Sequence, residues 1–140
     1  MKKVILFLIQ LIIFSTVYSQ ENESNEYEAL KLDYKILKIE TTENCYLISV
    51  IDSADHKYTI ISLLTDIENG TKIEINKTYS FQLYILKNPP RDVYGNYIIG
   101  GIYDFDLTID GVSIKIKGDS DTGVVVTTPN LKGLYYIHEQ

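Results

Sequence analysis

The clearest pattern of apolar and polar positions in this chain runs from Phe105 to Ile116, in the segment FDLTIDGVSIKI. Asp110-Gly111 at its centre suits a two-residue type I′ turn, because both central residues of that turn need a positive φ. A hairpin with this turn has one apolar face and one polar face, and a one-residue slip would lose both patterns. The apolar pairs would be Ile109 with Val112, Leu107 with Ile114 and Phe105 with Ile116, and the polar pairs Thr108 with Ser113, Asp106 with Lys115 and Asp104 with Lys117. The sequence therefore predicts this register and an all-β protein.

Other short apolar stretches, separated by turn residues about every eight to twelve positions, predict further strands. The alternation over Leu32 to Glu40 changes phase after Ile36, which indicates a β-bulge, although the same stretch also fits a short amphipathic helix. Cys45 to Ile51 is apolar at nearly every position, so we expect a strand that is covered on both faces. A further strand from Thr78 to Leu86 would have four core-facing residues: Tyr79, Phe81, Leu83 and Ile85.

The elements together predict a small barrel or a Greek-key sandwich of about seven to nine short strands. Thr65 to Glu68 fits a capping box, and Gly70 is placed to end it, so one short helical turn is expected between strands. The order of elements from Leu32 to Ile116 broadly resembles that of an OB-like barrel. In such a barrel, the residues beyond Gly118 would be extra. The sequence does not choose between barrel and sandwich.

The first nineteen residues have the form of a secretory signal peptide: two lysines, an apolar run from Val4 to about Phe14, and small or polar residues near Ser19. The run is interrupted by Gln10 and is shorter than the about 20 apolar residues of a membrane span. We therefore expect residues 1–19 to be removed, residues 20–29 to form a disordered acidic leader, and residues 30–140 to fold as one domain. The mature protein would be secreted or periplasmic, with no stable membrane span.

The charge balance weighs against nucleic acid as a partner. Cleavage would remove Lys2, Lys3 and no acid, so 13 basic residues become 11 against 19 acidic ones, for a net charge of −8. An acidic domain without a basic stripe repels phosphate backbones. Cys45 is the only cysteine and cannot form an internal disulfide, so we expect it to be buried and unreactive.

No motif in the chain indicates an enzyme, a cofactor or a metal site. The candidate bases are His56 and His138, and no serine stands in a GxSxG turn. Asp119 and Asp121 resemble the start of a calcium loop, but Gly123 occupies the position where a further ligand would be needed, so a solvated turn is the expectation. Two histidines without nearby cysteines give no zinc pattern. Carboxylate pairs for hydrolysis are defined in space, and spacing along the chain does not identify them.

The candidate binding residues are polar and aromatic groups that the predicted strands do not require. Tyr84 shares a strand face with Ser80 and Gln82, opposite the apolar side, and two prolines stiffen the entry to a loop from Asn88 to Tyr97. Exposed tyrosine beside polar groups is common in protein and carbohydrate contacts. The predicted binding residues are Tyr84, Arg91, Asp92, Tyr94 and Asn96.

These observations favour a non-catalytic module that binds a protein or a glycan in the cell envelope or outside the cell. Two alternatives remain. A carboxylate-dependent hydrolase would require two acids that converge in a pocket. A secreted inhibitor or immunity-type protein would present a protruding loop to one enzyme.

The signal-peptide prediction can be tested directly. Terminal sequencing of the exported protein should begin at Gln20, because Val17 and Ser19 stand at the positions that precede a signal cleavage site. An exported protein that still begins with Met1 would contradict the prediction.

Overall fold

The computed structural model describes residues 30–87, 92–96, 103–119 and 121–138. The expectations for residues 1–29 and for Arg91 lie outside these residues. The described part is all-β, and none of it is a helix that could cross a membrane. Its strands are β1 (Leu30–Thr41), β2 (Cys45–Ile51), β3 (Lys57–Leu63), β4 (Thr71–Lys72), β5 (Thr78–Lys87), β6 (Tyr103–Ile109), β7 (Val112–Gly118), β8 (Val124–Thr127), β9 (Leu131–Lys132) and β10 (Tyr135–Tyr136).

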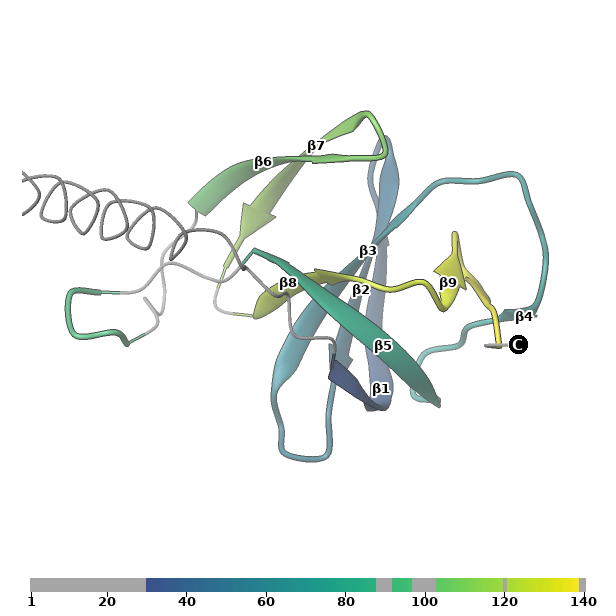
Figure 1. Ribbon diagram of the computed structural model, residues 1–140, viewed down its shortest axis with the longest axis horizontal. Helices are drawn as coiled ribbons and strands as arrows, with labels where there is room; N and C mark the ends of the chain where they lie inside the picture. Colours follow the sequence, from purple (N-terminus) through teal and green to yellow (C-terminus); the bar gives the residue numbers. More distant parts are fainter. Residues whose placement is uncertain (1–29, 88–91, 97–102, 120, 139–140) are drawn as a thin grey trace, which may run out of the picture.

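Five of these strands form a closed barrel in the order β1-β2-β3-β8-β5, with β5 paired back to β1 (Figure 1). The pairs are antiparallel except for β3 with β8, which run parallel. This is the arrangement of a small OB-like barrel, one of the two architectures that the sequence predicts. The expectation that residues beyond Gly118 are extra to the barrel is wrong. The strand that closes the barrel is β8, and the hairpin before it is the insertion.

The long first strand owes its curvature to the predicted bulge. The register of β1 against β2 shifts between Ile36 and Lys38, where the sequence alternation changes phase. An extra residue in one strand increases its twist and bends it. The bend lets β1 pair with β2 in its second half and with β5 in its first half, so one strand contributes to two sides of the barrel. The helical alternative for this stretch is wrong.

Aromatic and branched side chains fill the barrel. Phe81 and Leu83 of β5 are fully buried, and Tyr79 and Ile85 pack against the same core, as their alternation predicts. The ring of Tyr34 is also fully buried and stacks edge-on against Tyr58, with centroids 5.5 Å apart. Burial, together with nearby Tyr58 and Asp52, raises the pKa of Tyr34 to about 12. The described side chains inside the barrel therefore form a packed, largely apolar core.

The hairpin β6–β7 has the predicted register in full, including the pairs Ile109 with Val112 and Asp106 with Lys115. Asp110 and Gly111 have φ values of 48° and 79°, as a type I′ turn requires. The hairpin forms a two-stranded sheet of its own and packs its apolar face onto the outside of the barrel. This second core covers Cys45 and Leu47 of β2, so the prediction that Cys45 to Ile51 is covered on both faces is confirmed for the first half of the strand. Ser49 and Ile51, further along, are half-buried and belong to neither core.

The predicted helical turn at Thr65 to Gly70 is wrong, because contacts from distant residues replace the cap. The Thr65 hydroxyl accepts a hydrogen bond from Ile67 N at 3.2 Å, but the Glu68 carboxylate interacts with the Tyr135 hydroxyl instead of returning to Thr65. Gly70 has a φ of 106° and lies so close to the carbonyl of Tyr136 that a side chain would clash. The chain then enters β4, which pairs with β10 in a three-stranded sheet, β4-β10-β9.

The turn of the hairpin supplies a stability test. Gly111→Val should lower the free energy of unfolding by about 1–3 kcal/mol, because a β-branched residue would be held at positive φ. No atom lies within 4 Å of where its Cβ would be, so the effect should come from the backbone alone. Thr108→Val, on the exposed face of the same hairpin, should change stability by about 0.5 kcal/mol or less. Denaturation by urea would compare the two, and equal losses would contradict the turn assignment.

Candidate functional site

The predicted binding residues fall into two separate places. Asp92, Tyr94 and Asn96 lie together in one turn, the loop 92–96, which Figure 1 draws apart from the barrel strands. Tyr84 lies on β5 and is 37% exposed, as its position opposite the apolar face predicts. Arg91 lies outside the described residues. The structure thus gives two surfaces to consider, the loop 92–96 and a groove that contains Tyr84.

The backbone of the loop 92–96 is held in a closed turn. Asp92 N donates a hydrogen bond to Asn96 O at 2.8 Å, and Gly95 N donates to Asp92 O at 3.0 Å. The carboxylate oxygen Oδ1 of Asp92 accepts hydrogen bonds from Tyr94 N and Asn96 N, both at 2.9 Å. Gly95 has a φ of 83°, a conformation that glycine adopts without strain. The local sequence therefore encodes its own turn, as Asp and Asn commonly do.

The charge of Asp92 is part of this turn. The pKa of Asp92 is lowered, above all by the hydrogen bond from the Asn96 backbone N–H. Desolvation acts in the opposite direction and would raise this pKa. Further hydrogen bonds from the Asn96 side chain and from Tyr94 N lower it again. The carboxylate is thus ionised at neutral pH. Its hydrogen bonds are present above its lowered pKa and are lost as the pH falls through that value. Asp92 and Asn96 are occupied with each other, so their role in the loop is to position its backbone.

The turn presents two apolar side chains to solvent. Val93 is 93% exposed and Tyr94 is 87% exposed. Sequence reasoning identified Tyr94 but missed Val93, because it looked for hydrogen-bonding and aromatic groups. The available signal was the position of Val93 inside a short Asp-X-X-Gly-Asn turn, where a buried side chain is not expected. Exposed apolar side chains on a fixed turn are suited to insertion into a partner's pocket.

Tyr84 contributes to a groove of about 700 Å³ near the tip of the hairpin, which we call the hairpin-tip groove. The groove forms because β3 pairs with β8 only as far as Ile60, whereas it pairs with β2 as far as Leu63, so the two strands separate. Its walls combine apolar surface with hydroxyl groups and include Leu64, Tyr84, Ile109, Thr127, Thr128 and Pro129. The volume is in the range of small-ligand sites, but the walls are open to solvent along part of the groove.

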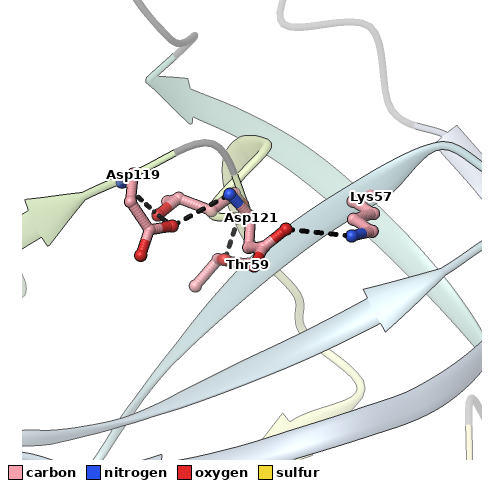
Figure 2. A network of polar contacts seen from close by, with 5 residues as sticks. Lys57, Thr59, Asp119 and Asp121 are labelled. Atoms are coloured by element: carbon pink, nitrogen blue, oxygen red, sulfur yellow. Dashed lines mark hydrogen bonds and ion pairs between the residues drawn. The ribbon is translucent and has the colours of Figure 1, made fainter. Parts of the chain in front are cut away.

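A second, smaller cleft of about 260 Å³ is lined by charged residues from β1, β3 and the turn after β7. Figure 2 shows how the turn is held there: Lys57 Nζ donates to Asp121 Oδ1 at 3.1 Å, and the Thr59 hydroxyl donates to Thr122 O at 2.7 Å. Asp119 Oδ1 accepts from Asp121 N at 2.9 Å. The two aspartates therefore serve the turn itself, as expected for a solvated turn. No cluster of three or more potential metal ligands occurs in the part of the chain that the structure describes.

Each acid of this cleft has a partner of its own. The side chain of Asp121 is 82% exposed and faces Lys57, and Glu40 is ion-paired with Lys38 at 2.7 Å. Hydrolysis by two carboxylates needs an acid that is kept protonated by burial or by a like charge. In the described residues, this cleft holds each acid against a cation or a backbone N–H group.

The Asp52–His56 pair has two members of a catalytic triad, but it belongs to a turn. Asp52 Oδ1 accepts from the backbone N–H groups of Ala54 and His56, both at 2.9 Å, and Oδ2 lies 3.1 Å from His56 Nδ1. Burial alone would raise the pKa of Asp52, but the hydrogen bonds from His56 and Ala54 outweigh it and lower the pKa. Within the described residues, no serine or cysteine is hydrogen-bonded to His56. Cys45 is fully buried, 3.1 Å from the Thr42 hydroxyl.

The role of Asp92 can be measured by amide hydrogen exchange. Asp92→Ala should speed exchange of the Tyr94 and Asn96 amides several-fold, because both lose their acceptor. The same amides in the unsubstituted protein should exchange faster, after correction for intrinsic rates, once the pH falls below the lowered pKa of Asp92. Asp66→Ala, at another exposed loop aspartate, is the control and should leave these amides unchanged. Unaltered exchange in Asp92→Ala would show that the carboxylate does not hold the turn.

Comparison with known proteins gives no relative from which a function could be inferred. No protein-family model, curated protein or solved structure matches the chain. The geometry of the loop 92–96 and of the hairpin-tip groove is therefore the basis on which the function is argued.

Proposed function

We propose that this chain is a non-catalytic protein-binding module of the cell envelope or the extracellular space, and that the loop 92–96 is its main contact. The observation that carries the proposal is the near-complete exposure of Val93 and Tyr94 on a turn whose backbone is fixed by Asp92. Neither side chain contributes to either apolar core of the described residues. Their exposure is thus unexplained by the stability of the fold.

A preorganised loop favours binding for a physical reason. Association costs free energy when side chains and loops have to be ordered, and a turn that is already closed in the free protein avoids part of that cost. Tyrosine contributes a large contact area with few rotatable bonds and is enriched among the residues that dominate interface energies. Val93 and Tyr94 would enter a pocket on the partner, and the polar groups of Asn96 would lie at the rim.

The shape of the turn bears on the alternative of a secreted inhibitor. An inhibitor that mimics a protease substrate commonly offers an extended segment, whereas Asp92 and Asn96 are hydrogen-bonded to each other across a closed turn. The turn therefore supports a contact of the knob-in-pocket kind. An immunity-type protein that blocks another surface of an enzyme would also fit this description.

Glycan binding is the second candidate, and it has a different site. In the hairpin-tip groove Tyr84, whose ring is partly exposed, pairs across the strands with Thr127, which gives a stacking surface beside a hydrogen-bonding group.

Binding of nucleic acid and hydrolysis by a pair of carboxylates have less support. The mature chain carries a net charge of −8, and the acids of the charged cleft are paired with lysines or with their own turn.

Affinity capture with matched variants tests the proposal. The exported protein, immobilised and exposed to the envelope fraction of its own source, should retain a partner that the double variant Val93→Ala/Tyr94→Ala loses. Each truncation at the centre of an interface typically costs about 1–2 kcal/mol or more, so binding should weaken roughly tenfold or beyond. The double variant should melt within a few degrees of the unsubstituted protein, because neither side chain is in a core.

The control is Ile67→Ala, which truncates another exposed apolar residue, 57% exposed, in a different loop. It should retain the partner at full strength. If the double variant binds every captured protein as well as the control does, the loop is not the site. Loss of binding to a glycan array in Tyr84→Ala, with the loop variant unaffected, would instead identify the hairpin-tip groove as the functional surface.

A further inference from the structure

The strand β3 loses one of its two neighbours before it ends. Its ladder with β8 stops at the pair Ile60–Val126, whereas its ladder with β2 continues to the pair Leu63–Cys45. In the described residues no other strand pairs with β3 on the side that β8 leaves. The last residues of β3 therefore form a short sheet edge within an otherwise closed barrel.

The backbone groups of Leu63 face this edge. In an antiparallel ladder, residues whose N–H and C=O groups bond to the neighbouring strand alternate with residues whose groups point away from it. Leu64 N donates a hydrogen bond to Asn44 O at 3.2 Å, so Leu64 is of the first kind. Leu63, one position earlier and opposite Cys45, is of the second kind. Its N–H and C=O groups thus point away from β2, toward the side where the ladder with β8 has ended.

The turn after β8 is bonded to β5. Asn130, which is 4% exposed, accepts a hydrogen bond from Gln82 N of β5 through its Oδ1 atom at 2.8 Å. The N–H group of Asn130 donates to the Thr128 hydroxyl at 3.2 Å and so closes the turn on itself. A side chain therefore takes the place of the ladder on the β5 side, and the turn is held there while β3 continues beyond its last pair with β8.

The hairpin-tip groove runs along the edge of β3. Five consecutive residues, 61–65, line it, together with residues 127–129 and the tip of the hairpin. Its apolar surface includes Leu64, which is 41% exposed, and Tyr84, which is 37% exposed. An extended chain rises about 3.3 Å per residue, so an added segment of four or five residues would match this wall in length.

We propose that the hairpin-tip groove binds an extended segment of a protein partner, which adds to the end of β3 as a short strand. A peptide backbone offers N–H and C=O groups at the spacing of a sheet edge, and an open edge is a template for such pairing. The added segment exchanges hydrogen bonds with Leu63, and its side chains contact Leu64 and Tyr84. This surface is separate from the loop 92–96. A glycan, which would use the ring of Tyr84 and not the edge, is the competing outcome.

Selection of peptides on the exported protein tests the proposal. The bait is the Val93→Ala/Tyr94→Ala variant, so that these two exposed side chains cannot supply the contact, and the probe is a phage-displayed library of random heptapeptides. A selected peptide, synthesised and added in excess, should slow hydrogen exchange of the Leu63 amide by about tenfold or more. The Leu64 amide, which already has an acceptor in the β1–β2 loop, is the internal control and should change by about twofold or less.

Methylation of the peptide backbone separates strand addition from contact through side chains alone. Alternate N–H groups of an added strand face β3, so N-methylation of one alternate set should weaken binding about tenfold or more, and of the other set about twofold or less. Equal effects of the two sets on the dissociation constant would overturn the proposal. So would a selection that yields no peptide able to protect the Leu63 amide, and binding of an oligosaccharide alone, lost in Tyr84→Ala, would then assign the groove to glycans. Because the bait lacks the loop contact, each result is independent of the partner proposed for that loop.

Discussion

The structure depends on the pairing of β8 with two partners at once. This strand runs parallel to β3 on one side and antiparallel to β5 on the other, and without it the barrel would have two open edges. Open edges present unpaired backbone groups, and closure removes them. Because β5 and β8 are antiparallel neighbours in the barrel, the end of β5 lies beside the start of β8. Everything carried by residues 88–123, including the loop 92–96 and the hairpin, is an insertion with both ends fixed.

The insertion adds a second apolar core outside the first. The barrel interior is filled by its own side chains, so the outer face of β2 and β3 would be exposed apolar surface if nothing covered it. Large exposed apolar patches on a monomer are uncommon and usually have a partner. Here the partner is the chain's own hairpin. OB-like barrels use this face and the adjoining loops for ligands, and in this chain the hairpin occupies it.

Among the described residues, the two surfaces considered above as binding sites differ physically. The loop 92–96 is convex, rigid through its own hydrogen bonds, and presents two apolar side chains. The hairpin-tip groove is concave and results from the separation of β3 from β8. A convex apolar contact suits a pocket on a protein partner, whereas a groove with an aromatic wall and hydroxyl groups suits a smaller polar ligand. The exposure of Val93 and Tyr94 makes the first the stronger proposal.

The sequence by itself determined the features that depend on residues close together along the chain. The hairpin register, the bulge after Ile36 and the core side of β5 follow from alternation and turn chemistry, which act over a few residues. Tertiary contacts decided the rest. Gly70 lies against the carbonyl of Tyr136, and the residues after it pair with β10, so partners far along the chain decide the path of the segment predicted as a capped turn. Val124 to Thr127 gives no sign in its own residues that it closes the barrel, since any short apolar strand could do so. The turn sequence around Val93 favours an exposed side chain, but its 93% exposure also requires that no other part of the described chain packs on it.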